Sequence, residues 1–352
     1  MNPLLPLGLL SFGTLVGAWW LTGRLRDYAL SRRVLDIPNS RSSHSVATPR
    51  GGGAAIVIAT LVGLLAAGFL GSVPWPHVMG FMGSGALVAA VGFIDDHKQL
   101  RRRWRLLAHF AAAGWLLWYF QGLPALESMW FVLDEGWRGH AFALLYVVWV
   151  LNLTNFMDGI DGIAAIEVIT VACGGILLYL VVSANSSQWA ACLVLAAATL
   201  GFLPWNWPPA KIFMGDAGSG FLGVMLAALS IAAARTDPTL FWCWIILLGV
   251  FVVDATMTLT RRVLRGERIH EAHRTHAYQL AAMRWRGHRT VTLAVAAINL
   301  CWLLPLALAV ARHSLDGLIG VAVAYTPLIA LAAWIGAGSP AATPEAAATG
   351  TR

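Results

Sequence analysis

The sequence predicts an all-α integral membrane protein that crosses the bilayer about eleven times. Of its 352 residues, 58% are hydrophobic and only 12% are charged, and the mean hydropathy is +0.69. These values exclude an ordinary soluble domain, which carries a larger share of charged residues. The formal net charge of +7 comes from basic residues gathered between apolar runs. That pattern is typical of membrane orientation and of contact with phosphates or lipid headgroups.

The predicted spans are apolar runs close to the length of about 20 residues that a helix needs to cross the hydrocarbon core. They cover residues 3–22, 52–71, 77–94, 105–121, 141–154, 162–182, 188–203, 219–234, 239–259, 290–311 and 316–337. The run at 141–154 is short, and the run at 219–234 is marginal. The first run has no basic residue before it and no convincing cleavage site, so we expect a retained helix rather than a signal peptide.

The basic residues predict the orientation of these spans. Of the 24 lysine and arginine residues, all but Arg138, Arg235 and Arg312 fall on one side of the predicted topology. Because basic loops favour the cytoplasmic side, we expect the N-terminus outside and the C-terminus in the cytoplasm. The cytoplasmic loops are then 23–51, 95–105, 152–162, 204–219 and 260–289. We expect one transmembrane catalytic domain over residues 1–337 and a disordered tail over 338–352, which is rich in Ala, Thr, Gly and Pro.

A periodic polar segment interrupts the apolar sequence between two of these spans. Its recurring residues are Asn152, Asn155, Asp158 and Asp161. Residues three apart are neighbours on a helix face, so the spacing predicts a polar stripe aimed in one direction. Gly159 and Gly162 would let a ligand or another backbone come close. The alternative is a polar loop that only joins two helices, but carboxylates at or inside a membrane usually mark functional sites.

Asp95 and Asp96 are adjacent carboxylates at the end of the third run. Two such groups repel each other unless a divalent cation, a basic partner or water stabilises them. A solvated helix C-terminus is the alternative, although anions there oppose the helix dipole. The pair favours a cation site or a general base.

A glycine-rich segment, Gly215-Asp216-Ala-Gly218-Ser219-Gly220, opens the eighth run. Glycines at a helix N-terminus form a phosphate-binding surface. Asp216 would repel a bare phosphate, so a bridging cation is implied, and Mg²⁺ commonly joins one or two carboxylates to substrate phosphates. The segment is not a Walker loop, which requires Gly-Lys-Ser/Thr.

The loop before the tenth run is dense in histidine and arginine. The residue four after His270 is Arg274, so the loop lacks the His-Glu-x-x-His pattern of a zinc protease. An anion-binding loop fits this composition, and an ordinary basic cytoplasmic loop is the alternative. Together the polar segments predict a cytoplasmic polyphosphate that meets a lipid, and therefore phosphoryl transfer. A transporter or flippase would carry its charges near the bilayer midplane, and a lipid phosphatase is a second alternative.

Five motifs in order give the chain a family resemblance. They are Asp36-Ile-Pro-Asn39 with His44 and Pro49-Arg50-Gly-Gly; Asp95-Asp96; Asn152-x-x-Asn155-x-x-Asp158-Gly-x-Asp161-Gly; Phe213-Met-Gly-Asp216-x-Gly-Ser219; and His273-x-x-His276. With these motifs the chain resembles the polyprenyl-phosphate N-acetylhexosamine-1-phosphate transferase superfamily, the glycosyltransferase 4 family. The wording around His273 looks most like the enzymes that initiate bacterial O-antigen synthesis.

The resemblance implies a reaction and its participants. Undecaprenyl phosphate attacks the β-phosphate of a UDP-N-acetylhexosamine, giving undecaprenyl-diphospho-sugar and UMP as the first membrane step of O-antigen or other cell-envelope polysaccharide synthesis. The implied cofactor is Mg²⁺, for which Mn²⁺ could substitute. The implied location is the bacterial inner membrane, with the active site on the cytoplasmic face. The partners are the two substrates, membrane lipids and, as an option, a second copy of the chain. No nucleic acid is implied.

The resemblance also assigns roles to residues. Asp216 would bind the metal with help from Asn155. The catalytic carboxylates would be Asp95 and Asp96 near the lipid phosphate, one as a base, with Asp158 and Asp161 near the nucleotide and the metal. The substrate-binding residues would be Asn152, Asn206, Phe213, Arg41, His44, Arg50, His273, Arg274 and His276. Relatives often carry a lysine in the first cytoplasmic loop and a His-x-His-His pattern in the last. Here Arg41 or Arg50 must supply that charge, and the pattern is His273-Arg-Thr-His276.

Overall fold

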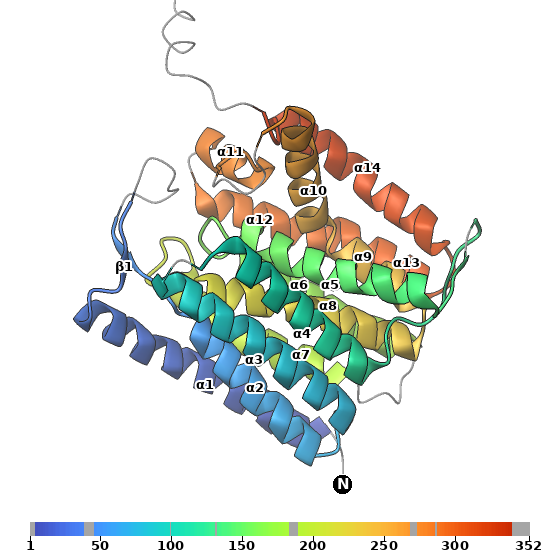
Figure 1. Cartoon of the computed structure of the whole chain (residues 1–352), viewed down its shortest axis with the longest axis horizontal. Helices are drawn as coiled ribbons and strands as arrows, with labels where there is room; N and C mark the ends of the chain where they lie inside the picture. Colours follow the sequence, from blue (N-terminus) through green and yellow to red (C-terminus); the bar gives the residue numbers. More distant parts are fainter. Residues whose placement is uncertain are drawn as a thin grey trace, which may run out of the picture.

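The computed structural model describes residues 4–38, 46–98, 100–130, 132–182, 189–267, 273–285 and 287–339, and these residues are mostly helical (Figure 1). The predicted contacts of Arg41 and His44 lie outside the described residues, as does the tail from residue 340 onward.

The helices run in the order α1 (Leu4–Ser31), α2 (Gly53–Phe69), α3 (Trp75–Lys98), α4 (Arg102–Phe120), α5 (Trp137–Met157), α6 (Ile163–Val182), α7 (Trp189–Asn206), α8 (Asp216–Thr236), α9 (Thr239–Leu247), α10 (Gly249–Leu264), α11 (Ala277–Arg284), α12 (His288–Ile298), the π-helical turn η1 (Asn299–Leu303), α13 (Leu304–Ala311) and α14 (Gly317–Ile335). Two short antiparallel sheets pair β1 (Leu35–Asp36) with β2 (Thr48–Pro49), and β3 (Leu126–Glu127) with β4 (Val132–Leu133).

The helices confirm an all-α, multi-pass membrane protein. Within the described residues, eight helices are long and apolar enough to cross a bilayer: α1, α3, α5, α6, α7, α8, the continuous α12–η1–α13, and α14. A ninth crossing is counted if α9 and α10, bent by 70° at their junction, form one broken span. The helix α2 has 17 residues, and α4 falls outside this set. Each of the eleven predicted runs is helical, but the number of crossings stays a prediction.

The helix α8 occupies the centre of the bundle and is buried along its whole apolar length. Its sequence is rich in Gly and Ala, small residues that let membrane helices approach closely. A side chain at Gly92 of α3 would come within 2.6 Å of the Asp216 carbonyl oxygen. This close approach places the end of α3, with Asp95 and Asp96, directly beside the first turn of α8.

The chain before α2 is attached to the chain before α8. The Phe213 N–H donates to the Pro49 carbonyl at 2.8 Å, and the Gly52 N–H donates to the Phe213 carbonyl at 2.9 Å. In Figure 1, β1 lies at one end of the helical bundle and the β3–β4 hairpin lies at the other. The polar motifs therefore meet at the end of the bundle that carries β1.

Candidate active site

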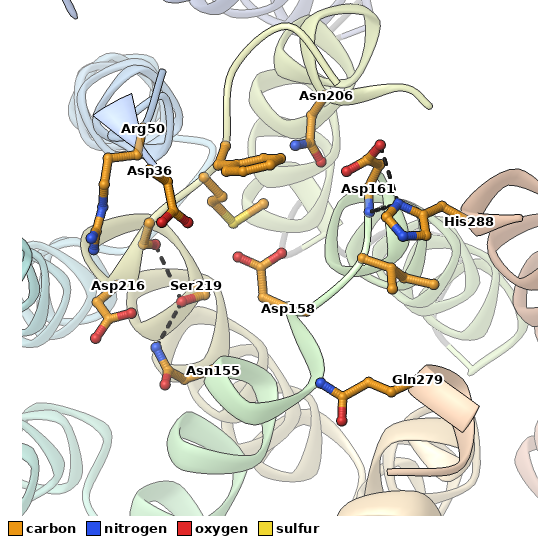
Figure 2. Close-up of a pocket in the computed structure, with 15 residues that line it drawn as sticks. Asp36, Arg50, Asn155, Asp158, Asp161, Asn206, Asp216, Ser219, Gln279 and His288 are labelled. Carbon is orange, nitrogen blue, oxygen red and sulfur yellow. Dashed lines mark hydrogen bonds and ion pairs between the residues drawn. The ribbon is translucent and has the colours of Figure 1, made fainter. Parts of the chain in front are cut away.

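A polar pocket of about 270 Å³ opens at this end of the bundle (Figure 2). Its wall combines residues from β1, the residue after β2, the end of α5 and the loop after it, the end of α7, the segment before α8, and the starts of α8, α11 and α12. The lining residues are Asp36, Arg50, Asn155, Asp158, Gly159, Ile160, Asp161, Asn206, Phe213, Met214, Gly215, Asp216, Ser219, Gln279 and His288. The pocket thus collects residues from three of the five sequence motifs, together with Asn206 and two residues that no prediction named, Gln279 and His288.

Asp158 follows the last residue of α5, and its carboxylate points toward the middle of the pocket (Figure 2). Part of its surface faces the pocket, but protein surrounds it on the other sides. Burial raises the pKa of Asp158 well above its usual range, and the negative charges of Asp216, Asp161 and Asp96 raise it further. Such a carboxylate is stabilised in its charged form by a cation.

Asp216 begins α8 and is held from two sides. On one side, Arg105 of α4 lies 3.7 Å from its carboxylate. On the other, the Asn155 side chain hydrogen-bonds to Asp216 and also donates from Nδ2 to Ser219 Oγ at 2.9 Å. Asn155 therefore fixes the orientation of Asp216 relative to α5 and α8.

Asp95 and Asp96 are both buried against arginines. Asp96, whose side chain is 4% exposed, pairs with Arg50 and accepts the backbone N–H groups of Asp216 at 3.2 Å and Ala217 at 3.4 Å. Asp95 pairs with Arg105 at 2.5 Å and accepts the Leu100 N–H at 2.6 Å. Each of the two adjacent carboxylates is thus stabilised by a basic side chain, one of the partners that the sequence analysis considered. Neither aspartate lines the pocket itself.

The donor set of the pocket suits a hard divalent cation. In the described part of the chain, no three His, Cys, Asp or Glu side chains converge to hold a metal by themselves. Asp216 and Asp158 nevertheless face the same pocket, and Mg²⁺ is usually held by one or two carboxylates, with water and substrate phosphates completing its shell. The residues present therefore fit Mg²⁺ bound together with a phosphate substrate.

Asp161 connects three segments that form the other wall. Its carboxylate accepts the Ala210 N–H at 3.1 Å and lies 3.2 Å from His288 Nδ1. Its carbonyl accepts the Thr292 hydroxyl at 2.9 Å. Asp161 therefore holds the wall of the pocket in place, and it fixes the position of the His288 ring at the start of α12.

Asn206, at the end of α7, is 3% exposed. Its Oδ1 accepts the Gly162 N–H at 2.9 Å, and its Nδ2 donates to the Ile212 carbonyl at 3.0 Å. Both ends of the carboxamide therefore hold backbone, although the residue lines the pocket. Phe213 and Arg50 are half-buried beside it.

The expectation of one polar stripe is wrong at Asn152. Its Nδ2 donates to the Val148 carbonyl at 2.7 Å, its side chain hydrogen-bonds to His109, and it does not line the pocket. A step of three residues advances 300° around a helix rather than a full turn, so Asn152 and Asp158 cannot share one direction. The helix also ends at Met157, and Asp158 and Asp161 reach the pocket from a loop.

The histidine loop divides between the surface and the core. His276 is 2% exposed, lies 3.2 Å from Asp254 through Nδ1, and is the N-cap residue of α11, and it does not line the pocket. The His273 ring stacks on His276 with centroids 4.9 Å apart and does not line the pocket. Arg274 is exposed and lines a second cavity of about 540 Å³, which shares Asp161, Gln279 and His288 with the first.

The predicted site did not include Asp36, Arg105, Gln279 and His288, whose polar side chains lie at or beside the pocket. Asp36 stands inside the first motif, which was a usable signal, and Gln279 follows the last motif by three residues. Arg105 is one of several arginines in its loop, and His288 is isolated in sequence, so neither carries a local pattern that indicates a site.

Comparison with known proteins gives consistent similarities. The model of glycosyl transferase family 4 matches residues 78–234. The chain is 31% identical to a probable undecaprenyl-phosphate N-acetylglucosaminyl 1-phosphate transferase of Bacillus subtilis, over 79% of this chain and 78% of that protein. It is 29% identical to the decaprenyl-phosphate N-acetylglucosaminephosphotransferase of Mycobacterium tuberculosis, over 83% of this chain and 80% of that protein. It is 32% identical to a phospho-N-acetylmuramoyl-pentapeptide-transferase of Streptococcus pyogenes, over 60% of this chain and 66% of that protein.

Proposed function

This chain belongs to glycosyl transferase family 4, and from that membership we propose that it transfers an N-acetylhexosamine 1-phosphate from a UDP-sugar to undecaprenyl phosphate. A lipid phosphate oxygen forms a bond to the β-phosphorus, the bond between that phosphorus and the α–β bridging oxygen breaks, and UMP leaves with the electron pair. The products are undecaprenyl-diphospho-sugar and UMP. The single observation that carries the proposal is the pocket that gathers Arg50, Asn155, Asp158, Asp161, Phe213 and Asp216.

The donor diphosphate is proposed to bind at the Asp216 end of this pocket. Mg²⁺, held there by Asp216 and oriented through Asn155, would neutralise charge on the phosphates; Mn²⁺ is proposed to substitute. Phe213 offers an aromatic face on which a uracil ring can stack. Asn206 and Asp161 support this wall through backbone contacts. The proposal therefore gives them a supporting role for the nucleotide.

The acceptor phosphate is proposed to approach beside Arg50 and Arg105. Arginine recognises phosphate through charge-assisted hydrogen bonds. Asp95 and Asp96 orient these two arginines by direct ion pairs. A phosphate monoester is already largely ionised near neutral pH, because its second pKa is about 6. The acceptor therefore needs no strong base, and we assign Asp95 and Asp96 a positioning role.

The location follows from the basic residues. We propose eleven crossings, an external N-terminus and a pocket on the cytoplasmic face of the bacterial inner membrane, because the pocket end of the bundle carries the arginine-rich segments. We further propose the first membrane step of O-antigen or related polysaccharide synthesis, in a monomer or homodimer.

The test uses purified protein, Mg²⁺, undecaprenyl phosphate and a panel of radiolabelled UDP-N-acetylhexosamines. We expect UMP release matched by butanol-extractable label with at least one donor. No label transfer with any donor would contradict the proposal, and release of inorganic phosphate from lipid substrates without transfer would indicate a phosphatase. Asp216→Asn should abolish turnover even at saturating Mg²⁺, whereas the control Asp134→Asn, at an exposed site, should not.

A further inference from the structure

The loop before α6 and α6 itself are joined to α12 and the following turn η1 by three successive contacts. At the top, His288 lies 3.2 Å from the Asp161 carboxylate. One turn deeper, the Thr292 hydroxyl donates to the Asp161 carbonyl at 2.9 Å. Deeper still, Asn299 donates from Nδ2 to Glu167 Oε2 at 2.7 Å. The first two contacts involve the pocket residues Asp161 and His288, and the third lies farther along the same two segments.

Glu167 is an acidic side chain buried inside the helical bundle. It is 0% exposed, and Asn299 is 2% exposed. Asn299 also donates to Thr170 Oγ1 at 2.8 Å. Asn299 begins η1, the wider π-helical turn between α12 and α13. Ionisable residues in membrane-spanning helices are costly to bury and usually serve a purpose.

Two oxygen atoms in this cluster lack a donor. Among the residues that the structure describes, neither Glu167 Oε1 nor Asn299 Oδ1 has a hydrogen-bond partner. No basic side chain in the same described ranges forms an ion pair with Glu167. A charged carboxylate here would be buried with one amide donor, which is a costly arrangement.

A proton on the Glu167 carboxyl group removes the buried charge. It also supplies the hydrogen-bond donor that this cluster of acceptor oxygens lacks. We propose that Glu167 is a neutral carboxylic acid that ties α12 to α6 and thereby positions His288 and Asp161 in the pocket. Glu167 is a positioning residue, because it does not line the pocket. Its effect on the reaction rests on the proposed function, whereas its protonation does not.

The protonation is tested by infrared difference spectroscopy of the purified full-length protein, wild type minus Glu167→Gln. We expect a band of a protonated carboxyl group that shifts in D₂O and is absent from the difference with the control Glu127→Gln, an exposed glutamate at the other end of the bundle. A difference spectrum that contains carboxylate bands in place of a protonated carboxyl band would overturn the proposal. This result stands even if no UDP-sugar proves to be a donor.

The positioning role is tested by kinetics and by thermal unfolding of the same proteins. Because Gln reproduces a neutral acid, Glu167→Gln should keep kcat/KM within about twofold of wild type. On this scale, a tenfold loss of kcat/KM corresponds to ~1.4 kcal/mol of lost transition-state stabilisation. Glu167→Ala and Asn299→Ala should lower kcat/KM about tenfold to a hundredfold, as small displacements of a catalytic wall do. Rescue by Gln distinguishes positioning from misfolding. A Glu167→Gln variant as impaired as Glu167→Ala would overturn the proposal.

Discussion

The ion pair between Arg50 and Asp96 joins the residue after β2 to the last turn of α3, beside the first turn of α8. A double-mutant cycle with Arg50→Gln, Asp96→Asn and the combined variant measures its contribution. The Asp96 side chain is 4% exposed and that of Arg50 is 33% exposed, so the two single substitutions are not equivalent. Removing Arg50 leaves a buried carboxylate, whereas removing the Asp96 charge leaves an arginine that can reach water.

The structure sets the size of the effect. Removing one partner of a fully buried ion pair costs about 3–5 kcal/mol. Arg50 is one-third exposed, and Asp96 keeps two backbone donors at the α8 N-terminus, where a negative charge gains about 0.3–1 kcal/mol. We therefore expect Arg50→Gln to lower the free energy of unfolding by about 1–3 kcal/mol. The coupling free energy between the two positions should be about 1–2 kcal/mol.

The assay is equilibrium unfolding in mixed micelles with increasing denaturing detergent, at low and high salt. High salt should leave most of the coupling in place, because buried pairs are screened less than surface pairs. A coupling free energy within about 0.5 kcal/mol of zero would refute the reasoning, since sites that do not interact are additive to that precision. The acceptor-side arginine would then be held by other contacts.

Three further predictions concern the pocket and its surroundings. Asp158→Asn should stabilise the protein in EDTA near neutral pH. The pKa of Asp158 is raised in the folded state, so its ionisation destabilises the fold as pH rises above the unfolded-state pKa of about 3.9. The gain in free energy of unfolding should therefore vanish near pH 4, and lower stability of the variant at neutral pH would contradict this. His276→Ala should lower the free energy of unfolding by about 1–2 kcal/mol through its lost contact with Asp254, while a raised donor KM in initial-rate assays would show that His276 touches substrate. Asn155→Ala should lower kcat about tenfold or more because Asn155 orients Asp216, and an equal effect of Asn152→Ala in parallel assays would argue against the separate directions of the two side chains.

The sequence was sufficient for a helical, multi-pass membrane protein and for part of the pocket. Apolar runs near the length of a span identify helices without tertiary information, and each predicted run is helical. The motifs at Asp158, Asp161, Phe213 and Asp216 do meet in one pocket. Their convergence was predictable because all follow or begin helices at the same predicted membrane face.

Side-chain direction and pairing were not predictable from the same patterns. The spacing of Asn152 and Asn155 does not reveal that one contacts His109 and the other Asp216. The doublet Asp95-Asp96 does not indicate which arginines neutralise it, because Arg50 and Arg105 come from other segments. The density of histidines near residue 273 suggested ligand contact, yet His276 packs on Asp254 in the core. These outcomes depend on tertiary contacts that local spacing does not encode.

In the proposed reaction, the β-phosphate of the donor is transferred together with the sugar. The purified protein is given a UDP-N-acetylhexosamine labelled at the β-phosphate, together with undecaprenyl phosphate and Mg²⁺, and the label is followed. We expect the label in the lipid fraction and unlabelled UMP as the released nucleotide. Label that leaves in UDP, or as inorganic phosphate without reaching the lipid, would contradict the proposal.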